Sequence, residues 1–214
     1  MNEIITDVEK LNEIGRCQEI DVQKDSKEAR EITSQLKRAL RKNDNIVALS
    51  APSLGFNKRI FCVDYSDNEI KTYINPVIMN WEGLQLSREV CSALPGKEFI
   101  RPRNTKIDLI FQTPTGAIKT QQFKGVAACT IQHEIDHLEG ITLQDIGLEI
   151  DSDFDDATDE EKQEIIDMYL DSLDMRRDTI HKEIDDDPEL HAVSERFRFV
   201  EALARGDIKL EQLD

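Results

Sequence analysis

The segment from Ile131 to Gly140 constrains the fold more than any other part of the sequence, because it contains the pattern H-E-x-x-H. On a helix, this spacing brings His133 and His137 onto the same face, one turn apart. Two imidazoles placed in this way can bind one Zn²⁺ or Fe²⁺, and Glu134 lies beside them, where it can accept a proton from metal-bound water. The pattern predicts a metal-bearing helix; two histidines without a metal are the alternative.

Other segments carry the patterns of helices and short strands. The predicted elements are, in order, a helix at residues 25–42, a short apolar run at 46–55, strands at 59–64 and 72–76, and a hairpin of residues 106–112 and 117–123. Asp25 is the predicted cap of the first helix, with Glu28 at the capping-box position. Asn75-Pro76 is expected to end the second strand. Residues 89–96 show no periodicity and are expected to form an ordered loop.

Acidic charge is concentrated in the last third of the chain. Residues 1–147 carry 19 Lys and Arg against 21 Asp and Glu, whereas residues 148–214 carry 8 against 23, within a formal net charge of −17. This change of composition predicts two domains, 1–147 and 148–214. The first is expected to be α+β, with antiparallel β-sheets packed around the H-E-x-x-H helix, and the second to be a helical C-terminal extension.

Helical signals run through the acidic extension. Thr158 and Glu161 form a capping box, and Asp187-Pro188 opens a second helix. Each helix has an apolar stripe that must be buried, so the extension is expected to pack on the first domain or to mediate homodimerisation. Its negative charge disfavours direct contact with nucleic acid or with an anionic membrane.

The sequence carries no sign of secretion or of membrane insertion. The acidic N-terminus lacks the apolar stretch of a signal peptide, and no run approaches about 18 apolar residues. The four cysteines, Cys17, Cys62, Cys91 and Cys129, have no CxxC spacing, so reduced thiols are expected. These features predict a cytoplasmic protein.

Two histidines leave a metal short of at least one protein ligand. A third histidine in the metzincin spacing is excluded, because Leu143 occupies that position. Glu160 and Glu161 lie at the distance of the carboxylate ligand in thermolysin-like enzymes, but they begin an acidic helix. An upstream cysteine is the remaining possibility.

Three segments in the correct order resemble the peptide deformylase family. Residues 46–53 align with the pattern G-Φ-G-Φ-A-A-x-Q, where Φ is apolar, residues 89–93 align with E-G-C-L-S, and residues 132–137 match Q-H-E-x-D-H at every position. Shorter segments also look familial, namely Ile74-Asn75-Pro76, Pro95-Gly96 and Arg103. The resemblance covers residues from about 5 to 147 and leaves the acidic extension without a counterpart.

The resemblance implies a set of roles for the matching residues. Cys91, His133 and His137 would bind one divalent metal ion, Fe²⁺ or Zn²⁺, with water in the fourth position. Glu134 would be the general base that deprotonates this water and then protonates the leaving amine. The implied reaction removes the N-formyl group from formyl-methionyl peptides. Gln132 and Asp136 would orient the metal ligands through hydrogen bonds.

The sequence departs from the family pattern around the reacting groups. Ser53 replaces the glutamine that donates to the developing oxyanion, and loss of one such donor costs about 10²–10³ in rate. The backbone N–H of Ser92 can still act as a donor, although Ser92 and Val90 replace a leucine and a glycine. Ile46 and Ala48 replace two glycines. Glu98 stands where many family members have arginine, so recognition of the peptide could change.

Two other classes of function remain open at this stage. A zinc peptidase of the H-E-x-x-H type, or a hydrolase of another small amide, would use the same histidines and glutamate. A non-enzymatic interaction module would hold the metal as a structural ion. Structural sites have four protein ligands, and no convincing fourth ligand is present in the sequence.

Overall fold

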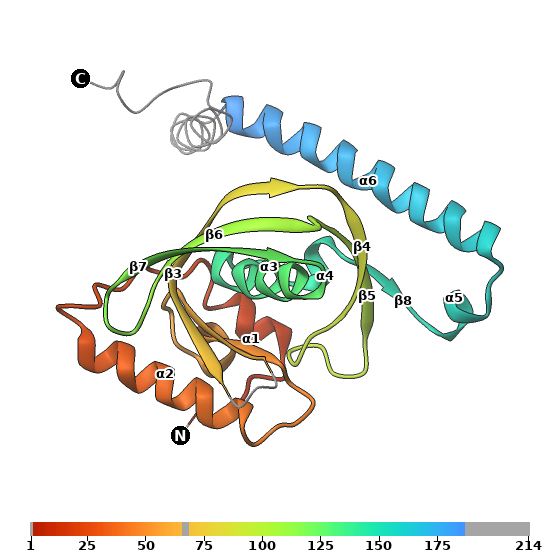
Figure 1. The fold of residues 1–214 in the computed structure, drawn as a ribbon. Helices are drawn as coiled ribbons and strands as arrows, with labels where there is room; N and C mark the ends of the chain where they lie inside the picture. Colours follow the sequence, from red (N-terminus) through yellow and green to blue (C-terminus); the bar gives the residue numbers. More distant parts are fainter. Residues whose placement is uncertain (1, 66–68, 187–214) are drawn as a thin grey trace. The chain divides into compact units, whose positions relative to one another are not determined.

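A five-stranded antiparallel sheet dominates the first part of the molecule (Figure 1). The computed structural model describes residues 2–65 and 69–186. The sheet has the order β1-β2-β3-β6-β7, formed by β1 (Ala48–Ser50), β2 (Ile60–Asp64), β3 (Ile70–Glu82), β6 (Lys106–Gln112) and β7 (Ile118–Lys124). The predicted hairpin of residues 106–112 and 117–123 is confirmed, because β6 and β7 pair in full register.

Strand β3 does not end at Asn75-Pro76, so the expectation of a break there is wrong. The register between β3 and β6 shifts between Ile74 and Val77, which accommodates a residue that has no N–H to donate. Asn75 adopts a φ of 47°, in the left-handed region that asparagine tolerates better than most residues. Its Nδ2 donates to the carbonyl oxygen of Ile20 (2.8 Å) and to Oε1 of Gln112 (3.0 Å), and these bonds hold the irregular backbone in place.

A second antiparallel sheet has three strands in the order β4-β5-β8. They are β4 (Gln85–Val90), β5 (Glu98–Arg103) and β8 (Leu148–Ile150). The loop expected at residues 89–96 therefore starts later, because Glu89 and Val90 belong to β4 and only the turns from Cys91 onward are irregular.

The helix with the two histidines is α3 (Val126–Glu139), and the other elements of the first unit surround it (Figure 1). Its residues Ala128, Ile131 and Leu138 are fully buried in an apolar cluster with side chains of the five-stranded sheet. The predicted fold class, α+β with antiparallel sheets around the H-E-x-x-H helix, is confirmed. The helix ends at Gly140, where φ is 76° and a Cβ atom would lie 2.8 Å from the backbone carbon of Gly15. Only glycine satisfies both conditions.

The first predicted helix is α2 (Ser26–Leu40), and it packs on β1 and β2. Asp25 precedes it but makes no side-chain capping bond, so that detail of the prediction is wrong. The turn before the helix is held by Asp21, whose Oδ1 accepts from the backbone N–H groups of Gln23 and Lys24. Three short helical elements complete the unit: α1 (Val8–Asn12), η1 (Ala51–Leu54) and α4 (Leu143–Ile146).

A second unit begins at Ser152 and contains α5 (Ser152–Asp156) and α6 (Asp159–Asp186). The capping box at Thr158 and Glu161 is confirmed, because Oε2 of Glu161 accepts from the Thr158 backbone N–H (2.8 Å) and the Thr158 hydroxyl accepts from the Glu161 N–H (3.3 Å). The helix expected to open at Asp187-Pro188 lies outside the described residues. Within residues 2–65 and 69–186, no helix has the length and apolar character needed to cross a membrane.

The division between the units falls after Asp151, four residues later than the change of composition suggested. The reason is β8, whose residues pair with β5 and bury Ile150 to an exposure of 7%. The acidic residues that mark the extension therefore begin before the first unit is complete.

Chains cut at these two positions should differ in stability. A chain of residues 1–147 loses the pairing of β8 with β5 and the buried side chain of Ile150, which is worth about 1.5–3 kcal/mol. We expect its melting temperature to lie about 3–12 °C below that of a chain of residues 1–151, at about 2–4 °C per kcal/mol for a chain of this size. Thermal unfolding followed by circular dichroism measures the difference, and equal melting temperatures would show that β8 adds nothing to the first unit.

Candidate metal centre

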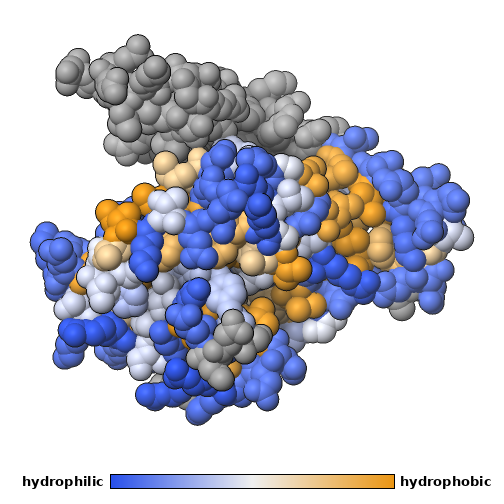
Figure 2. Space-filling model, viewed as in Figure 1, coloured by the Kyte–Doolittle hydropathy of each residue, from blue (hydrophilic) through white to orange (hydrophobic). Residues whose placement is uncertain are grey.

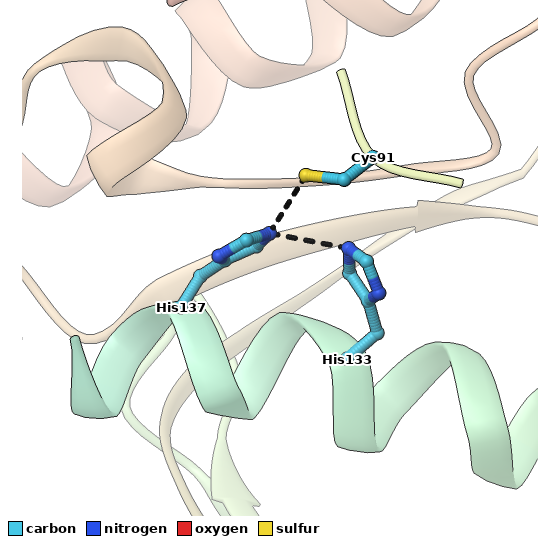
Figure 3. A group of neighbouring side chains, drawn as sticks. All are labelled: Cys91, His133 and His137. Atoms are coloured by element: carbon cyan, nitrogen blue, oxygen red, sulfur yellow. Dashed lines mark hydrogen bonds between the residues drawn. The ribbon is translucent and has the colours of Figure 1, made fainter. Parts of the chain in front are cut away.

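Three side chains from two distant segments converge beside α3 (Figure 3). Cys91 follows β4, and His133 and His137 lie on α3. The possible ligand atoms of this Cys–His–His cluster all lie within 4.8 Å of one another. The Cys91 Sγ is 3.3 Å from Nε2 of His137, which is 3.1 Å from Nε2 of His133. The structure thus brings together the three residues that the sequence resemblance selected as metal ligands.

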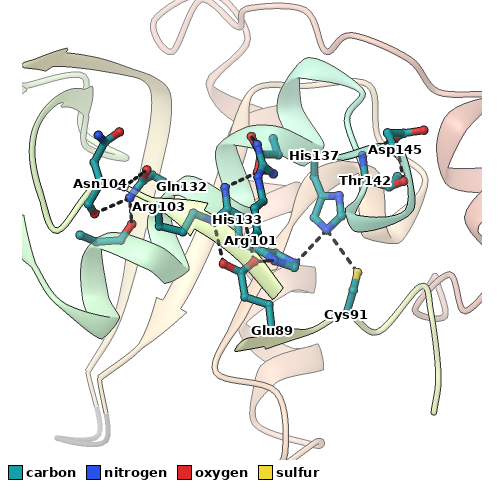
Figure 4. Close-up of polar contacts among 12 residues, drawn as sticks. Glu89, Cys91, Arg101, Arg103, Asn104, Gln132, His133, His137, Thr142 and Asp145 are labelled. Carbon is teal, nitrogen blue, oxygen red and sulfur yellow. Dashed lines mark hydrogen bonds and ion pairs between the residues drawn. The ribbon is translucent and has the colours of Figure 1, made fainter. Parts of the chain in front are cut away.

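His133 is oriented by a carboxylate on the three-stranded sheet (Figure 4). Its Nδ1 donates to Oε2 of Glu89 at 2.9 Å, so its Nε2 presents a lone pair to the cluster. Arg103 grips Glu89 with two bonds, from Nε to Oε1 (2.6 Å) and from Nη2 to Oε2 (2.7 Å). Burial by itself raises the pKa of Glu89, but hydrogen bonds from Arg103 and His133 outweigh it and lower this pKa to about 2. Glu89 is therefore a carboxylate that only accepts.

Asp136 bonds to Arg103 and not directly to His133 or Glu89. Nη1 of Arg103 donates to its Oδ2 at 2.6 Å, and Arg101 forms a second ion pair with the same carboxylate. Asp136 thus acts on His133 through Arg103 and Glu89. Gln132, the other residue expected to orient a ligand, bonds elsewhere: its Nε2 donates to the carbonyl oxygens of Asn104 and Ala128, both at 3.0 Å. It ties α3 to the segment that follows β5.

Glu134 is buried to an exposure of 4%, and its Oε2 has no hydrogen-bond partner among the described residues. Burial raises the pKa of Glu134 to about 7, against the opposing effects of His133 and the Ser50 hydroxyl. A carboxyl group with a pKa near neutrality is suited to accept and return a proton. A buried carboxyl group whose pKa is near neutrality thus lies beside the cluster.

The Cys–His–His cluster fits a divalent metal ion. One thiol and two imidazoles are the donor set that Zn²⁺ and Fe²⁺ accept, and three protein ligands leave a position open for substrate or water. The Cys91 Sγ and the Nε2 atoms of His137 and His133 face one another at 3.3 and 3.1 Å. A divalent cation among these three atoms would accept all of them as ligands in place of the hydrogen bonds that they make to one another.

The cluster opens into a cavity of about 580 Å³. Residues before and within β1, the strand β4 and one face of α3 line it, and Glu134 lies in its wall. Ser53 and Ser92, the expected oxyanion donors, both line the same cavity. Ser53 is buried and its Oγ lies 3.2 Å from Oγ of Ser50.

Glu98, the departure expected to affect recognition of the peptide, is paired with Arg88 on the neighbouring strand. Nε of Arg88 donates to Oε2 of Glu98 at 2.7 Å, and both side chains are about half exposed. Arg88 also lines the cavity. A guanidinium group is thus present at the cavity, carried by β4 and partly neutralised by β5.

Sequence reasoning missed Glu89, Arg101 and Gln85 as parts of the site. Glu89 was aligned with a family pattern but given no role, and the strand that carries it was not predicted. Burial along β4 alternates from Gln85 to Val90 with the period of a strand. The half-buried residues are polar, so the sequence lacks the apolar face by which a strand is usually predicted.

Comparison with known proteins agrees with this geometry. The family model for polypeptide deformylase matches residues 3–149. The chain is 42% identical over 108 residues to a peptide deformylase of Dictyoglomus turgidum, covering 50% of this chain and 70% of that protein. It is 38% identical over 103 residues to peptide deformylase 1 of Clostridium perfringens, covering 48% of this chain and 70% of that protein.

Solved structures give the same result. A probable peptide deformylase from Synechococcus phage S-SSM7 superimposes with a TM-score of 0.61 at 31% identity, covering 68% of this chain and 99% of that chain. The enzyme from Thermotoga maritima has the same fold, with a TM-score of 0.61 at 24% identity, covering 68% of this chain and 96% of that chain. Fold and sequence together define a deformylase-like hydrolase with a Cys–His–His cluster. The chain belongs to the peptide deformylase family.

Metal binding should depend on Cys91. We expect the full chain to bind about one equivalent of Zn²⁺ or Fe²⁺ and Cys91→Ala to lose most of it, because the variant gives up one of three ligands and the only thiolate. Cys129→Ala is the matched control, since Cys129 is a buried cysteine that lines the same cavity. Metal content is measured by inductively coupled plasma mass spectrometry. Full occupancy in Cys91→Ala would place the third ligand elsewhere, as in a zinc peptidase.

Proposed function

We propose that this protein hydrolyses the N-formyl group of formyl-methionyl peptides, using one divalent metal ion, and releases formate. The observation that carries the proposal is the meeting of the Cys–His–His cluster with the buried carboxyl of Glu134 at the wall of one cavity. Family membership supports the same reaction, and a formamide is small enough to enter a site bounded by buried side chains.

Cys91, His133 and His137 would hold the ion, with a net site charge of +1 from one thiolate and two neutral imidazoles. When bound, the ion would supply Lewis acidity, polarising the formyl carbonyl and lowering the pKa of a water molecule. Glu89, held by Arg103, keeps the ring of His133 in the ligating orientation and tautomer.

Glu134 moves the proton in this proposal. As a carboxylate it takes a proton from the attacking water at its oxygen, and it then returns that proton to the amine nitrogen of the departing peptide. Its burial and its unpartnered Oε2 support this role, because the group is shielded from bulk solvent and has a free acceptor oxygen.

Two groups are proposed to stabilise negative charge on the formyl oxygen. They are the backbone N–H of Ser92, which follows Cys91, and the hydroxyl of Ser53. A donor aimed at the developing oxyanion contributes more in a buried site than in water. The Ser53 Oγ also lies 3.2 Å from the Ser50 Oγ, in a hydrogen bond in which either hydroxyl can donate.

Formate release tests the proposed reaction. Anaerobically purified, metal-loaded protein should release formate from formyl-Met-Ala-Ser, and Glu134→Gln should reduce kcat about 10²–10⁴-fold while retaining the metal. Glu31→Gln on the exposed face of α2 is the matched control and should keep full activity. Absence of formate release by the metal-loaded wild-type protein would contradict the proposal.

The residue at position 53 should limit the rate. Glutamine reaches farther than serine and donates through an amide, so we expect Ser53→Gln to raise kcat/KM on formyl-methionyl peptides by up to about 10²-fold. Ser53 lines the cavity, so a longer side chain at this position would extend toward the open volume. Steady-state kinetics measure the change. If Ser53→Gln abolishes a strong wild-type activity, serine is adapted to a different small amide.

A further inference from the structure

Strand β4 and helix α3 form two walls of the cavity beside the Cys–His–His cluster. The half-buried residues of β4, Gln85, Ser87 and Glu89, form its inward face and alternate with exposed residues, which border the cavity as well. All three inward residues are polar, and all line the cavity. An ordinary ligand pocket is mostly apolar, and its few polar groups fix the orientation and the identity of the ligand. The polar residues of this wall are therefore candidates for recognising the ligand.

Two of the three inward side chains bond to one face of α3. Glu89 bonds to His133, and Nε2 of Gln85 donates to the thiol sulfur of Cys129 at 2.9 Å. Cys129 and His133 lie one helical turn apart, about 6 Å, whereas residues 85 and 89 lie about 13 Å apart along the strand. The two long side chains therefore converge on the helix, and the short side chain of Ser87 leaves open space between them.

Apolar residues occupy the outer part of this cavity. Val47, Val90 and Val126 line it with exposed fractions of 57%, 64% and 83%, and Figure 2 shows apolar surface over β4 and β5. The thiol of Cys129, by contrast, is buried to an exposure of 7%. A ligand side chain that passes the apolar rim therefore meets the amide of Gln85 and the thiol of Cys129.

The bond between Gln85 and Cys129 is one that a ligand can replace. Sulfur is a weak hydrogen-bond acceptor, so the amide N–H of Gln85 gains when an oxygen takes the place of the thiol. A donor that is shielded from water without a good acceptor raises the free energy of the folded protein. An oxygen acceptor on the ligand would lower it again. The amide N–H of Gln85 can therefore exchange the Cys129 sulfur for an oxygen acceptor on the ligand.

We propose that Gln85 and Cys129 determine which side chain the cavity accepts, and that they favour a side chain of methionine length with an oxygen acceptor at the position of the methionine sulfur. Methionine sulfoxide has such a side chain. The inference rests on the proposed function, because it places the formyl group at the cluster and the side chain of the same residue about one helical turn away, at Cys129.

The test compares three peptides, formyl-X-Ala-Ser, in which X is methionine, methionine sulfoxide or norleucine. Formate release by the full-length, Zn²⁺-loaded protein gives kcat/KM for each. Gln85→Leu should lower the ratio of sulfoxide to norleucine about 3–10-fold, the worth of one hydrogen bond. Cys129→Val should raise the same ratio, because Gln85 then lacks its resident acceptor.

A matched control separates this effect from a general loss of a glutamine. Gln122 on β7 is exposed, donates from Nε2 to Oδ1 of Asp108 at 2.8 Å, and does not line the cavity. Gln122→Leu should leave the ratio unchanged. The opposite signs expected for Gln85→Leu and Cys129→Val keep the test valid even when one variant is less stable.

Isothermal titration calorimetry with the unformylated peptides X-Ala-Ser provides a readout that does not need turnover. Sulfoxide selectivity that falls in Gln85→Leu and rises in Cys129→Val supports the inference. Formate release with the same ratio in wild type and both variants overturns the inference and leaves the proposed function intact. Failure to release formate from any peptide overturns the proposed function instead. In that case a sulfoxide peptide that binds wild type and Gln85→Leu equally well overturns the inference, and weaker binding to Gln85→Leu supports it.

Discussion

The hydrogen bond from His133 to Glu89 is the contact on which the site depends. It joins α3, which packs against the five-stranded sheet, to β4 of the three-stranded sheet. Glu89 is itself gripped by Arg103, whose side chain is 3% exposed. Removing one partner of a buried ion pair costs about 3–5 kcal/mol, because the other charge remains buried and unpaired. The orientation of the proposed ligand is therefore fixed by the same contacts that hold the sheets around the helix.

Helix α3 is buried on more than one face, and this explains how apolar packing and chemistry coexist on it. One side contributes Ala128, Ile131 and Leu138 to a core that includes Tyr73 stacked on Phe61, with ring centroids 4.7 Å apart. The other side carries the histidines and lines the cavity. Rigid packing behind the helix limits the freedom of the reacting side chains in front of it.

The sequence predicted those elements whose local pattern agrees with their environment. Helices α2 and α3 and strand β6 have apolar residues at the period of the structure that they form, and the Pro-Thr-Gly turn after β6 marks the hairpin with β7. Strand β4 could not be found in this way, because its inward residues Gln85 and Glu89 are polar and bond to groups far away in the sequence. The continuation of β3 through Pro76 could not be found either, since it depends on bonds from Asn75 to Ile20 and Gln112.

The candidate site divides along the same line. Residues 132–137 match a family pattern, so the two proposed histidine ligands and the base follow from the sequence, whereas the wall of the cavity emerges only from the pairing of strands. Gln85 and Glu89 reach α3 together because β4 pairs with β5 in one register, which places Gln85 opposite Arg103 and Glu89 opposite Phe99. A shift of one residue would turn both inward side chains to the outer face. One register thus orients His133 through Glu89 and places Gln85 against Cys129, so β4 couples the proposed chemistry to the proposed choice of side chain.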